Sequence, residues 1–230
     1  NMALGSVGGG QIAGFINIAG ANIGGWQVAG FMNVAGQQVK GGQIAGFMNV
    51  AENVKGLQLA PFNFADSSSG LSIGIFSFIR KGYHSIGFNA NETLPFGISF
   101  KSGTDGFYNI FSYSANPNNN LVGFGYGFGT LKRFKNKLYR SWEYEAYQLK
   151  SSLVSRFEFN MLSQLRLNIG YEITPWLNIS AGPHYAMHIR DVLANNYPPI
   201  QNPFNSENFI LGDTEWNHWL GGQVGLHFEF

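Results

Sequence analysis

The sequence predicts an all-β protein that ends in a transmembrane antiparallel β-barrel of about eight strands, preceded by short β-repeats. Three observations lead to this fold class. From Ser85 onward, apolar and polar residues alternate with a period of two. The first 70 residues contain a repeat with a period of about 16 residues. Charged residues make up only 12% of the chain, which is about half of their share in an ordinary soluble domain.

Composition narrows the class of protein further. Glycine accounts for 31 of 230 residues and aromatic residues for 16%, while the mean hydropathy is only −0.07. No segment offers the roughly 20 consecutive apolar residues that a transmembrane helix needs. Apolar residues that are dispersed by alternation are typical of a membrane barrel instead.

Net charge and cysteine usage exclude other classes. The formal net charge is +1, and the one basic cluster, at residues 132–137, falls where a turn is expected, so we expect no nucleic-acid binding. The chain has no cysteine, which excludes disulfides and thiolate metal sites. Asn1 is not an initiator and no basic n-region of a signal peptide follows it, so we interpret the chain as processed or trimmed.

The repeat is built on one nine-residue motif. It occurs at residues 11–19, returns at 27–35 and 43–51, and decays at 58–65. Glycine recurs in each copy at a cost of about 1 kcal/mol relative to alanine in a helix interior, so extended structure is favoured. Two arrangements remain open, a narrow β-solenoid with one coil per repeat or a run of short hairpins. The five- or six-residue spacing of the aliphatic positions favours the solenoid.

The repeats also predict a docking surface. Residues 1–39 carry no charge, so as a free module they would expose a strand-prone surface with unpaired edges. We therefore expect a neighbour, with the alternative that the repeats only stack on the barrel or cap it. The large aromatic residues that recur on this segment are the candidate docking residues, namely Phe15, Trp26, Phe31 and Phe47.

The chain is thus divided into three predicted parts. Residues 1–70 are the repeats, 71–83 a connecting strand or linker, and 84–230 the barrel. In residues 121–130 aromatic residues alternate with glycines, which leave room in a narrow lumen. The eight predicted barrel strands are 84–90, 95–102, 107–114, 121–130, 138–149, 157–173, 176–190 and 216–230.

Loop lengths predict the orientation of the barrel. Short turns at 103–106, 132–137 and 174–175 fall at one end, and the long loop 191–215 falls at the other. Outer-membrane barrels have short periplasmic turns and longer extracellular loops. We therefore expect a Gram-negative outer membrane, a periplasmic C-terminus and an extracellular 191–215 loop. A soluble barrel of lipocalin type would place the aromatic residues inside and the charges outside, and the shortage of charge disfavours it.

Charged and polar residues on the inward face predict a structural network that fills the lumen. Glu143 and Glu145 are two residues apart on one face and could also act as paired carboxylates. The narrow lumen of a small barrel makes paired charges the favoured interpretation. The predicted network consists of Glu143, Glu145, Arg166, Glu172, His184, His188, Arg190, His227 and Glu229.

No motif predicts catalysis or a cofactor. His184 and His188 lie four residues apart on a strand, about 13 Å, which is too far to share one metal ion. His188 with Ser151, Ser152 or Ser155 could be drawn as a hydrolase at the barrel rim, although no motif supports that choice. The glycine-rich stretches do not lie between a strand and a helix, so they are not phosphate loops. We expect no metal, no cofactor and no enzyme.

Several motifs resemble those of a known protein group. The stretches 43–51, 71–84 and 181–183 resemble uncharacterised envelope proteins of Bacteroidota, which carry glycine-rich surface repeats before a C-terminal barrel. The final residues 226–230 resemble the C-terminal assembly signal of outer-membrane proteins. This resemblance implies the fold and the location, and it implies no reaction, substrate or site residue.

Together these features predict a non-catalytic outer-membrane protein. The barrel would be an anchor in outer-membrane lipid, and the repeats would dock other envelope proteins in a hetero-oligomeric complex. Two alternatives from other classes remain. A small channel is suggested by the glycine-lined strand at 121–130, and a lipid-modifying hydrolase by the serines near the rim.

Overall fold

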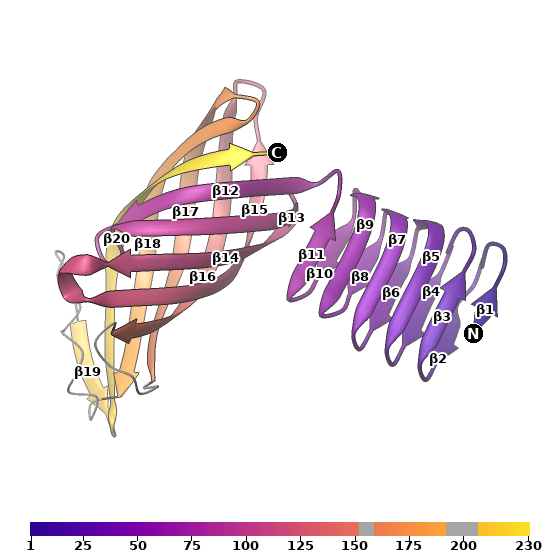
Figure 1. The fold of residues 1–230 in the computed structure, drawn as a ribbon, viewed down its shortest axis with the longest axis horizontal. Helices are drawn as coiled ribbons and strands as arrows, with labels where there is room; N and C mark the ends of the chain where they lie inside the picture. The colour runs from indigo at the N-terminus through magenta and orange to yellow at the C-terminus, as the bar shows by residue number, and fades with distance from the viewer. Residues whose placement is uncertain (152–158, 192–206) are drawn as a thin grey trace. The chain divides into compact units, whose positions relative to one another are not determined.

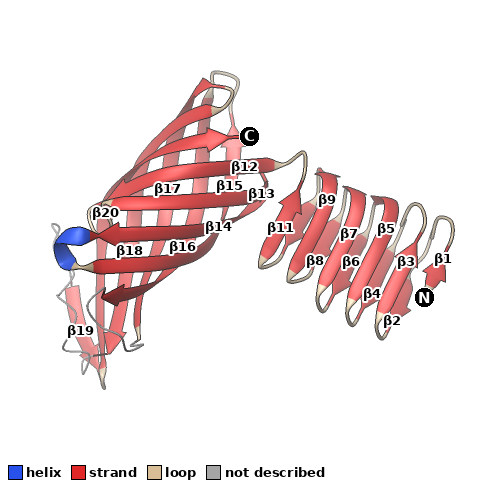
Figure 2. Ribbon diagram, viewed as in Figure 1, coloured by secondary structure: helices blue, strands red, loops and turns tan. Residues whose placement is uncertain are grey.

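The computed structural model describes residues 1–151, 159–191 and 207–230. Within these ranges the regular elements are strands, apart from one short 3-10 helix at Pro117–Asn119 (Figure 2). No helix in these ranges is long and apolar enough to cross a membrane. The chain forms two compact units, Asn1–His84 with Ser102–Asn109, and Ser85–Lys101 with Ile110–Phe230. The all-β fold class is confirmed.

The repeat unit is a parallel β-solenoid in which each repeat forms one coil (Figure 1). Strands at equivalent positions of successive repeats pair in register, so Asn17 lies beside Asn33 and Asn33 beside Asn49. Hairpins would pair neighbouring strands antiparallel, so this pairing selects the solenoid. The first sheet contains β1 (Met2–Ala3), β3 (Ile16–Ala19), β5 (Met32–Val39), β7 (Met48–Val54), β9 (Phe62–Ser68) and β11 (Phe76–Ile79). The second contains β2 (Gln11–Ala13), β4 (Trp26–Ala29), β6 (Gly42–Ala45), β8 (Leu57–Leu59) and β10 (Leu71–Ile73).

Residues 71–83 are not the connecting strand or linker that we predicted. Strands β10 and β11 pair in parallel with β8 and β9, and they form the last coil of the solenoid. The repeat is hard to recognise here because serine replaces glutamine and asparagine at the inward positions Ser72 and Ser77. Ser72 nevertheless keeps the contact with the coil before it, since its Oγ donates to Gln58 Oε1 at 3.0 Å.

Two ladders of amide side chains occupy the interior of the solenoid. Asn33 Nδ2 lies 3.0 Å from Asn49 Oδ1 in the next coil and 2.8 Å from the carbonyl oxygen of Ile44. Gln43 Nε2 donates in the same way to Gln27 Oε1 at 2.8 Å. Buried amides cost free energy unless they are hydrogen-bonded, so the ladders hold each coil in register on the next. The ladders consist of Asn17, Asn33, Asn49 and Asn63, and of Gln11, Gln27, Gln43 and Gln58.

Glycine is required at the corners where coils stack closely. A Cβ at Gly30 would collide with the carbonyl oxygen of Gly14 in the preceding coil, and a Cβ at Gly46 would collide with that of Gly30. These collisions are with backbone atoms, which cannot move aside without separating the coils. The glycines that recur in the motif therefore serve close stacking.

Side chains from the segment Ser102–Asn109 close the last coil. Asn109 Oδ1 accepts a hydrogen bond from the backbone N–H of Ser77 at 3.0 Å, and its Nδ2 donates to the carbonyl of Gly74 at 2.8 Å. Ser102 Oγ donates to the carbonyl of Ser77 at 2.9 Å. Asn109 thus takes the place of an asparagine from a further coil.

The second unit is built around a closed antiparallel barrel of eight strands, as predicted. The strands follow one another around the wall in chain order, and β20 pairs back with β12, with Ser85 opposite Glu229. The strands are β12 (Tyr83–Asn91), β13 (Phe96–Thr104), β14 (Phe107–Asn116), β15 (Leu121–Arg133), β16 (Leu138–Ser151), β17 (Asn160–Thr174), β18 (Leu177–Asp191) and β20 (Thr214–Glu229).

The barrel turns apolar residues outward and polar residues inward, as the alternation predicted. Phe124 on β15 is 63% exposed and Ile169 on β17 is 64% exposed, while Glu145 and Gln164 are fully buried. A lipocalin-type barrel has the opposite arrangement, so that alternative is wrong for this chain.

The predicted loop 191–215 is partly a strand. Residues 207–211 form β19 (Glu207–Leu211), which pairs antiparallel with the first part of β20. Gly212 adopts φ of 61° in the turn between them, a conformation that favours glycine. The prolines that predicted a loop lie at 198, 199 and 203, outside the described residues, so they do not interrupt this hairpin.

Replacing Asn33 by alanine should loosen the solenoid locally. The change leaves buried acceptors, including the carbonyl of Ile44, without their donor, at a cost of about 1–3 kcal/mol. Hydrogen exchange measured by mass spectrometry should be faster across residues 27–50. The matched control is Gln37→Ala, because Gln37 is exposed. Equal exchange in the two variants would contradict the role given to the ladders.

Candidate functional site

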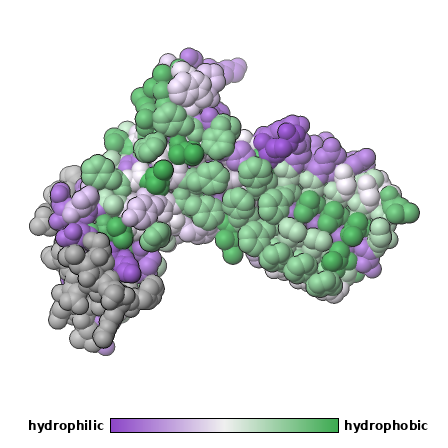
Figure 3. Space-filling model, viewed as in Figure 1, coloured by the Kyte–Doolittle hydropathy of each residue, from purple (hydrophilic) through white to green (hydrophobic). Residues whose placement is uncertain are grey.

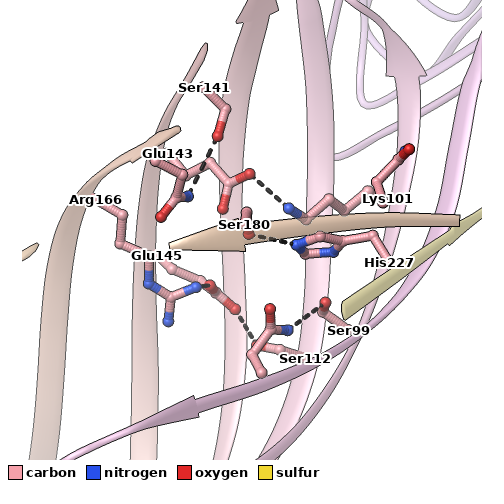
Figure 4. Close-up of polar contacts among 12 residues, drawn as sticks. Ser99, Lys101, Ser112, Ser141, Glu143, Glu145, Arg166, Ser180 and His227 are labelled. Atoms are coloured by element: carbon pink, nitrogen blue, oxygen red, sulfur yellow. Dashed lines mark hydrogen bonds and ion pairs between the residues drawn. The ribbon is translucent and has the colours of Figure 1, made fainter. Parts of the chain in front are cut away.

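The lumen of the barrel contains most of the polar residues predicted from the sequence. Figure 4 shows that Glu143, Glu145, Arg166 and His227 lie close together among inward-pointing serines and Lys101. Glu143, Glu145, Arg166 and His227 are each less than 5% exposed. Their hydrogen-bond partners decide what this arrangement can do.

The first lumen cluster is centred on Arg166 of β17. Its guanidinium pairs with Glu145 of β16, and its Nη2 also donates to the Tyr147 hydroxyl at 2.8 Å and to Gln164 Oε1 at 2.6 Å. Ser112 Oγ of β14 donates to the other carboxylate oxygen of Glu145. The Glu145 charge is therefore balanced by one guanidinium and held by two donors.

The second cluster spans the lumen. Lys101 Nζ of β13 lies 2.5 Å from Glu143 Oε1 of β16, and both side chains are buried. Two strands, β14 and β15, separate β13 from β16 in the wall, so this ion pair crosses the barrel interior. The two side chains therefore occupy part of the lumen.

The inward glycines of β15 make room for these side chains. A Cβ at Gly125 would collide with Ser112 Oγ and the ring of Tyr147, and one at Gly127 would collide with the backbone of Tyr144. The space that the glycines leave is therefore filled by neighbouring side chains of the barrel.

Glu92 was not predicted as part of the network. Its Oε1 accepts a hydrogen bond from Trp219 Nε1 at 2.8 Å and lies 2.9 Å from His184 Nε2. Its Oε2 accepts from the backbone N–H of Gly222 at 3.3 Å. Residues 219–222 of β20 pair with β18 on one side. On the other side they lie between the stretch paired with β19 and the stretch paired with β12, so the carboxylate lies at an edge of β20 that has no paired strand there.

Two further predicted residues lie at the end of the barrel where the chain terminates. Arg133 Nη1 pairs with Glu172 Oε1 at 2.5 Å, and Arg133 Nη2 with Glu229 Oε2 at 3.1 Å. Asn178 Nδ2 donates to Glu229 Oε1 at 2.7 Å. These side chains are partly exposed, so they form a rim cluster separate from the two buried ones.

The remaining two predicted residues lie toward the opposite end. His188 Nε2 lies 2.5 Å from Asn160 Oδ1, and Arg190 Nη2 lies 2.5 Å from Glu215 Oε2. The nine predicted residues thus all have partners, but they belong to several clusters instead of one site.

This arrangement does not assemble a recognisable reaction centre among the described residues. Glu143 and Glu145 each face their own cation, so they do not form a carboxylate pair of the kind that shares one proton. Ser180 Oγ lies 2.9 Å from His227 Nε2, which is the spacing of a nucleophile and its base. No carboxylate hydrogen-bonds the other ring nitrogen of His227 in the described ranges.

Within residues 1–151, 159–191 and 207–230, no group of three or more His, Asp or Glu side chains could hold a metal ion. Ser152 and Ser155, two of the serines considered for a rim hydrolase, lie outside the described residues, and so does the side chain of Ser151.

The second candidate surface is the outside of the solenoid. Phe15, Phe31 and Phe47 stack at the same corner of successive coils, with ring centroids 4.9 Å apart in both pairs. Phe15 is 63% exposed and Phe47 is 41% exposed. Trp26, at the start of β4, is 46% exposed and lies over Gly42 of the neighbouring coil. All four predicted docking residues therefore lie at the surface of the solenoid, and the three phenylalanines form a regular stack.

A charged cluster lies elsewhere on the solenoid. Asp66 Oδ2 pairs with Lys81 Nζ at 2.8 Å, and its other oxygen with Arg80. Hydrogen bonds from Lys81 and Arg80 hold the pKa of Asp66 below its ordinary value. The cluster is solvent-accessible, so it adds little to stability.

Comparison of the chain with protein-family models, with curated proteins and with solved structures gave no match. The residues and their geometry are therefore the basis for a functional proposal.

Removing one partner of the pair that crosses the lumen should destabilise the barrel. Glu143→Gln leaves the Lys101 ammonium buried without its counter-charge, at a cost of about 3–5 kcal/mol. Urea unfolding of the folded barrel in lipid vesicles, followed by its heat-modifiable gel mobility, would measure the change.

The double variant Lys101→Met with Glu143→Gln removes both charges and should recover much of the loss. Lys132→Met, at an exposed lysine, is the control for loss of a charge alone. A double variant less stable than Glu143→Gln would show that the pair is not the reason for the loss.

Proposed function

We propose that this chain is a non-catalytic, structural protein of the Gram-negative outer membrane. Its barrel is the anchor, and its solenoid docks the protein to a larger envelope assembly. The observation that carries the proposal is the inverted barrel, with exposed aromatic and aliphatic residues outside and paired charges inside. Contiguous apolar patches are rare on soluble monomers, and where they occur they mark contacts with other proteins or with a membrane.

The filled lumen supports an anchor over a channel. Lys101 and Glu143 meet across the interior, and Tyr147 with Glu145 fills the space beside the glycines of β15. Small barrels of eight strands are usually filled by their own side chains in this way. The contact between Ser180 and His227 lacks, among the described residues, a carboxylate that orients the histidine, so it does not favour the hydrolase alternative.

The positions of the turns support the proposed orientation. The turns after β13, β15 and β17 are short and lie at the end of the barrel that carries the C-terminus. Outer-membrane barrels have their short turns on the periplasmic side. The C-terminus is then periplasmic and the 191–215 loop extracellular.

The exposed aromatic residues support docking by the solenoid. Phe15, Phe47 and Trp26 present large rigid side chains without charge, and aromatic residues are enriched where proteins meet other surfaces. The phenylalanines stack over three successive coils, which suits an extended contact better than a small-molecule site.

Native extraction tests the assembly directly. The tagged full-length protein would be extracted in mild detergent and its companions identified by mass spectrometry. We expect a defined partner from the envelope in constant stoichiometry, absent from a control strain that carries the untagged chain. A stable monomer without companions would contradict the proposed docking role.

Bilayer recordings separate the anchor from the channel. The purified protein in a planar bilayer should show no steady conductance, because ion pairs and a buried tyrosine occupy the lumen. A porin in the same bilayer is the positive control. Reproducible single-channel steps from this protein would favour the channel instead.

A further inference from the structure

The solenoid has the same inversion as the barrel. Along β4 and β6, the inward residues are the ladder glutamines and alanines, while Val28 and Ile44 point outward. On the first sheet the inward residues are asparagines and alanines. The outward residues of the first sheet are Ile16, Ile18, Met32, Val34, Met48, Val50, Phe62, Phe64, Phe76 and Phe78. Those of the second are Ile12, Trp26, Val28, Ile44, Leu57, Leu59, Leu71 and Ile73.

Two outer sides of the solenoid are therefore free of polar side chains over consecutive coils. The phenylalanine stack lies at the corner that joins them, between β2 and β3 in the first complete coil and at the equivalent place in the next. The apolar surface is thus continuous from one sheet, around the corner, to the other. Figure 3 shows hydrophobic colour spread over the repeats on the face in view.

The third side carries the polar residues and forms what we call the polar ridge. In the coils this side is formed by the last residues of β5, β7 and β9 and the turns that follow them, beyond the register shift between Ala35 and Gln38. Ile23, Val39 and Val54 point inward on this side and are fully buried. Every charged residue of the segment 1–81 belongs to it. The polar ridge consists of Asn22, Gln37, Gln38, Lys40, Glu52, Asn53, Lys55, Asp66, Ser67, Ser69, Arg80 and Lys81.

We propose that the two apolar sides of the solenoid, over the coils from Gln27 to Ile79, contact the acyl chains of a membrane. The polar ridge then faces water and lipid head groups. This inference rests on the proposed function, in which the barrel is anchored in a membrane, and it names lipid as the neighbour of the apolar sides. It therefore assigns the phenylalanine stack at Phe31 and Phe47 to lipid instead of to a protein partner, and leaves the polar ridge as the surface on which the solenoid docks to the envelope assembly.

The backbone of these coils meets the strictest requirement of a lipid environment. In hydrocarbon each backbone N–H and C=O must be bonded within the protein. Each coil from Gln27 to Ser68 pairs with a coil on both sides, whereas the last coil, β10 and β11, pairs with one coil and is bonded on its other side at Gly74 and Ser77 by Asn109 and Ser102. The inward asparagines and glutamines are satisfied by their ladders.

The chemistry of the surface favours lipid over a protein partner. Protein interfaces carry about one hydrogen bond per 100–200 Å² and a polar rim. The two apolar sides offer no hydrogen-bonding side chain other than the indole of Trp26. Trp26 comes directly after Gly25, where the polar side of the coil ends and the second sheet begins. Tryptophan is enriched at the boundary between lipid and water, so this position suits a residue at the edge of the apolar surface.

The charge of the ridge points the same way. The ridge holds Lys40, Lys55, Arg80 and Lys81 against two acidic residues, which suits anionic lipid head groups.

Single-cysteine labelling tests this inference without removing any native cysteine, because the chain has none. The full-length variants Val34→Cys and Ile44→Cys probe the two apolar sides, and Gln37→Cys and Glu52→Cys probe the ridge. Ile169→Cys, on the outer wall of the barrel, is the membrane reference. Each is labelled with an environment-sensitive dye and reconstituted in vesicles with doxyl-labelled acyl chains, with aqueous iodide as the second quencher.

We expect doxyl lipid to quench the dye at 34 and 44 as strongly as at 169, and iodide to quench it at 37 and 52. Two positions on the apolar surface and two on the ridge guard against one variant that fails to fold, and heat-modifiable mobility checks the barrel of each. Quenching at 34 and 44 by iodide, with 169 still quenched by lipid, would overturn the inference and leave the barrel anchor standing.

Loss of lipid quenching at 169 would instead contradict the membrane barrel itself. Protection of 34 and 44 from both quenchers would overturn the inference as well, because another protein surface, such as a second copy, would then cover the apolar sides.

Discussion

The constraint on which the rest of the structure depends is that a polar side chain turned inward must find a hydrogen-bond partner inside. Strands place alternate residues on opposite faces, so an apolar exterior commits every second residue to the interior. In the solenoid those inward residues are asparagine and glutamine, and they bond to their own equivalents one coil away. In the barrel several of them are charged and bond to opposite charges on other strands, and uncharged ones such as Gln223 and Asn168 bond to each other.

The two solutions differ because the two geometries differ. In a parallel solenoid the equivalent residues of successive coils lie directly beside each other. An uncharged amide, which has both a donor and an acceptor, can therefore pair with the same residue type in the next coil. A barrel brings different residues together, so unlike charges can meet, as Arg166 and Glu145 do. A buried ion pair adds little net stability to the folded state, but removing one of its two partners is strongly destabilising. The lumen network therefore fixes which strands face each other more than it adds to the free energy of unfolding.

Much of the fold could be predicted because its signals are local. Period-two alternation is visible in each strand separately, which is why the barrel strands were placed within a few residues of their observed bounds. The 16-residue repeat favoured one coil per repeat. In such coils the equivalent residues of successive repeats lie beside each other, as Asn17 and Asn33 do. Residues 71–83 were missed because Ser72 and Ser77 replace the ladder amides.

The partners inside the lumen could not be predicted in the same way. Which charge meets which depends on strand register around the whole barrel, so the inward residues were identified but the pair of Lys101 with Glu143 was not. Glu92 lies in a turn, where no alternation marks it, and only closure of the barrel brings it to His184 and Trp219. Alternation in the repeats separates two sets of residues but does not indicate which set points inward. The apolar exterior of the solenoid could therefore be identified only from the structure.

The most direct test of the central claim is to map which side chains touch lipid in the whole protein at once. The reconstituted protein would be photolabelled with a carbene reagent that partitions into hydrocarbon, and the modified residues identified by mass spectrometry. The account predicts label on the outward residues of the barrel and of both solenoid sheets, with none on the lumen residues or the polar ridge. Label on the lumen residues, or an unlabelled barrel exterior, would contradict it.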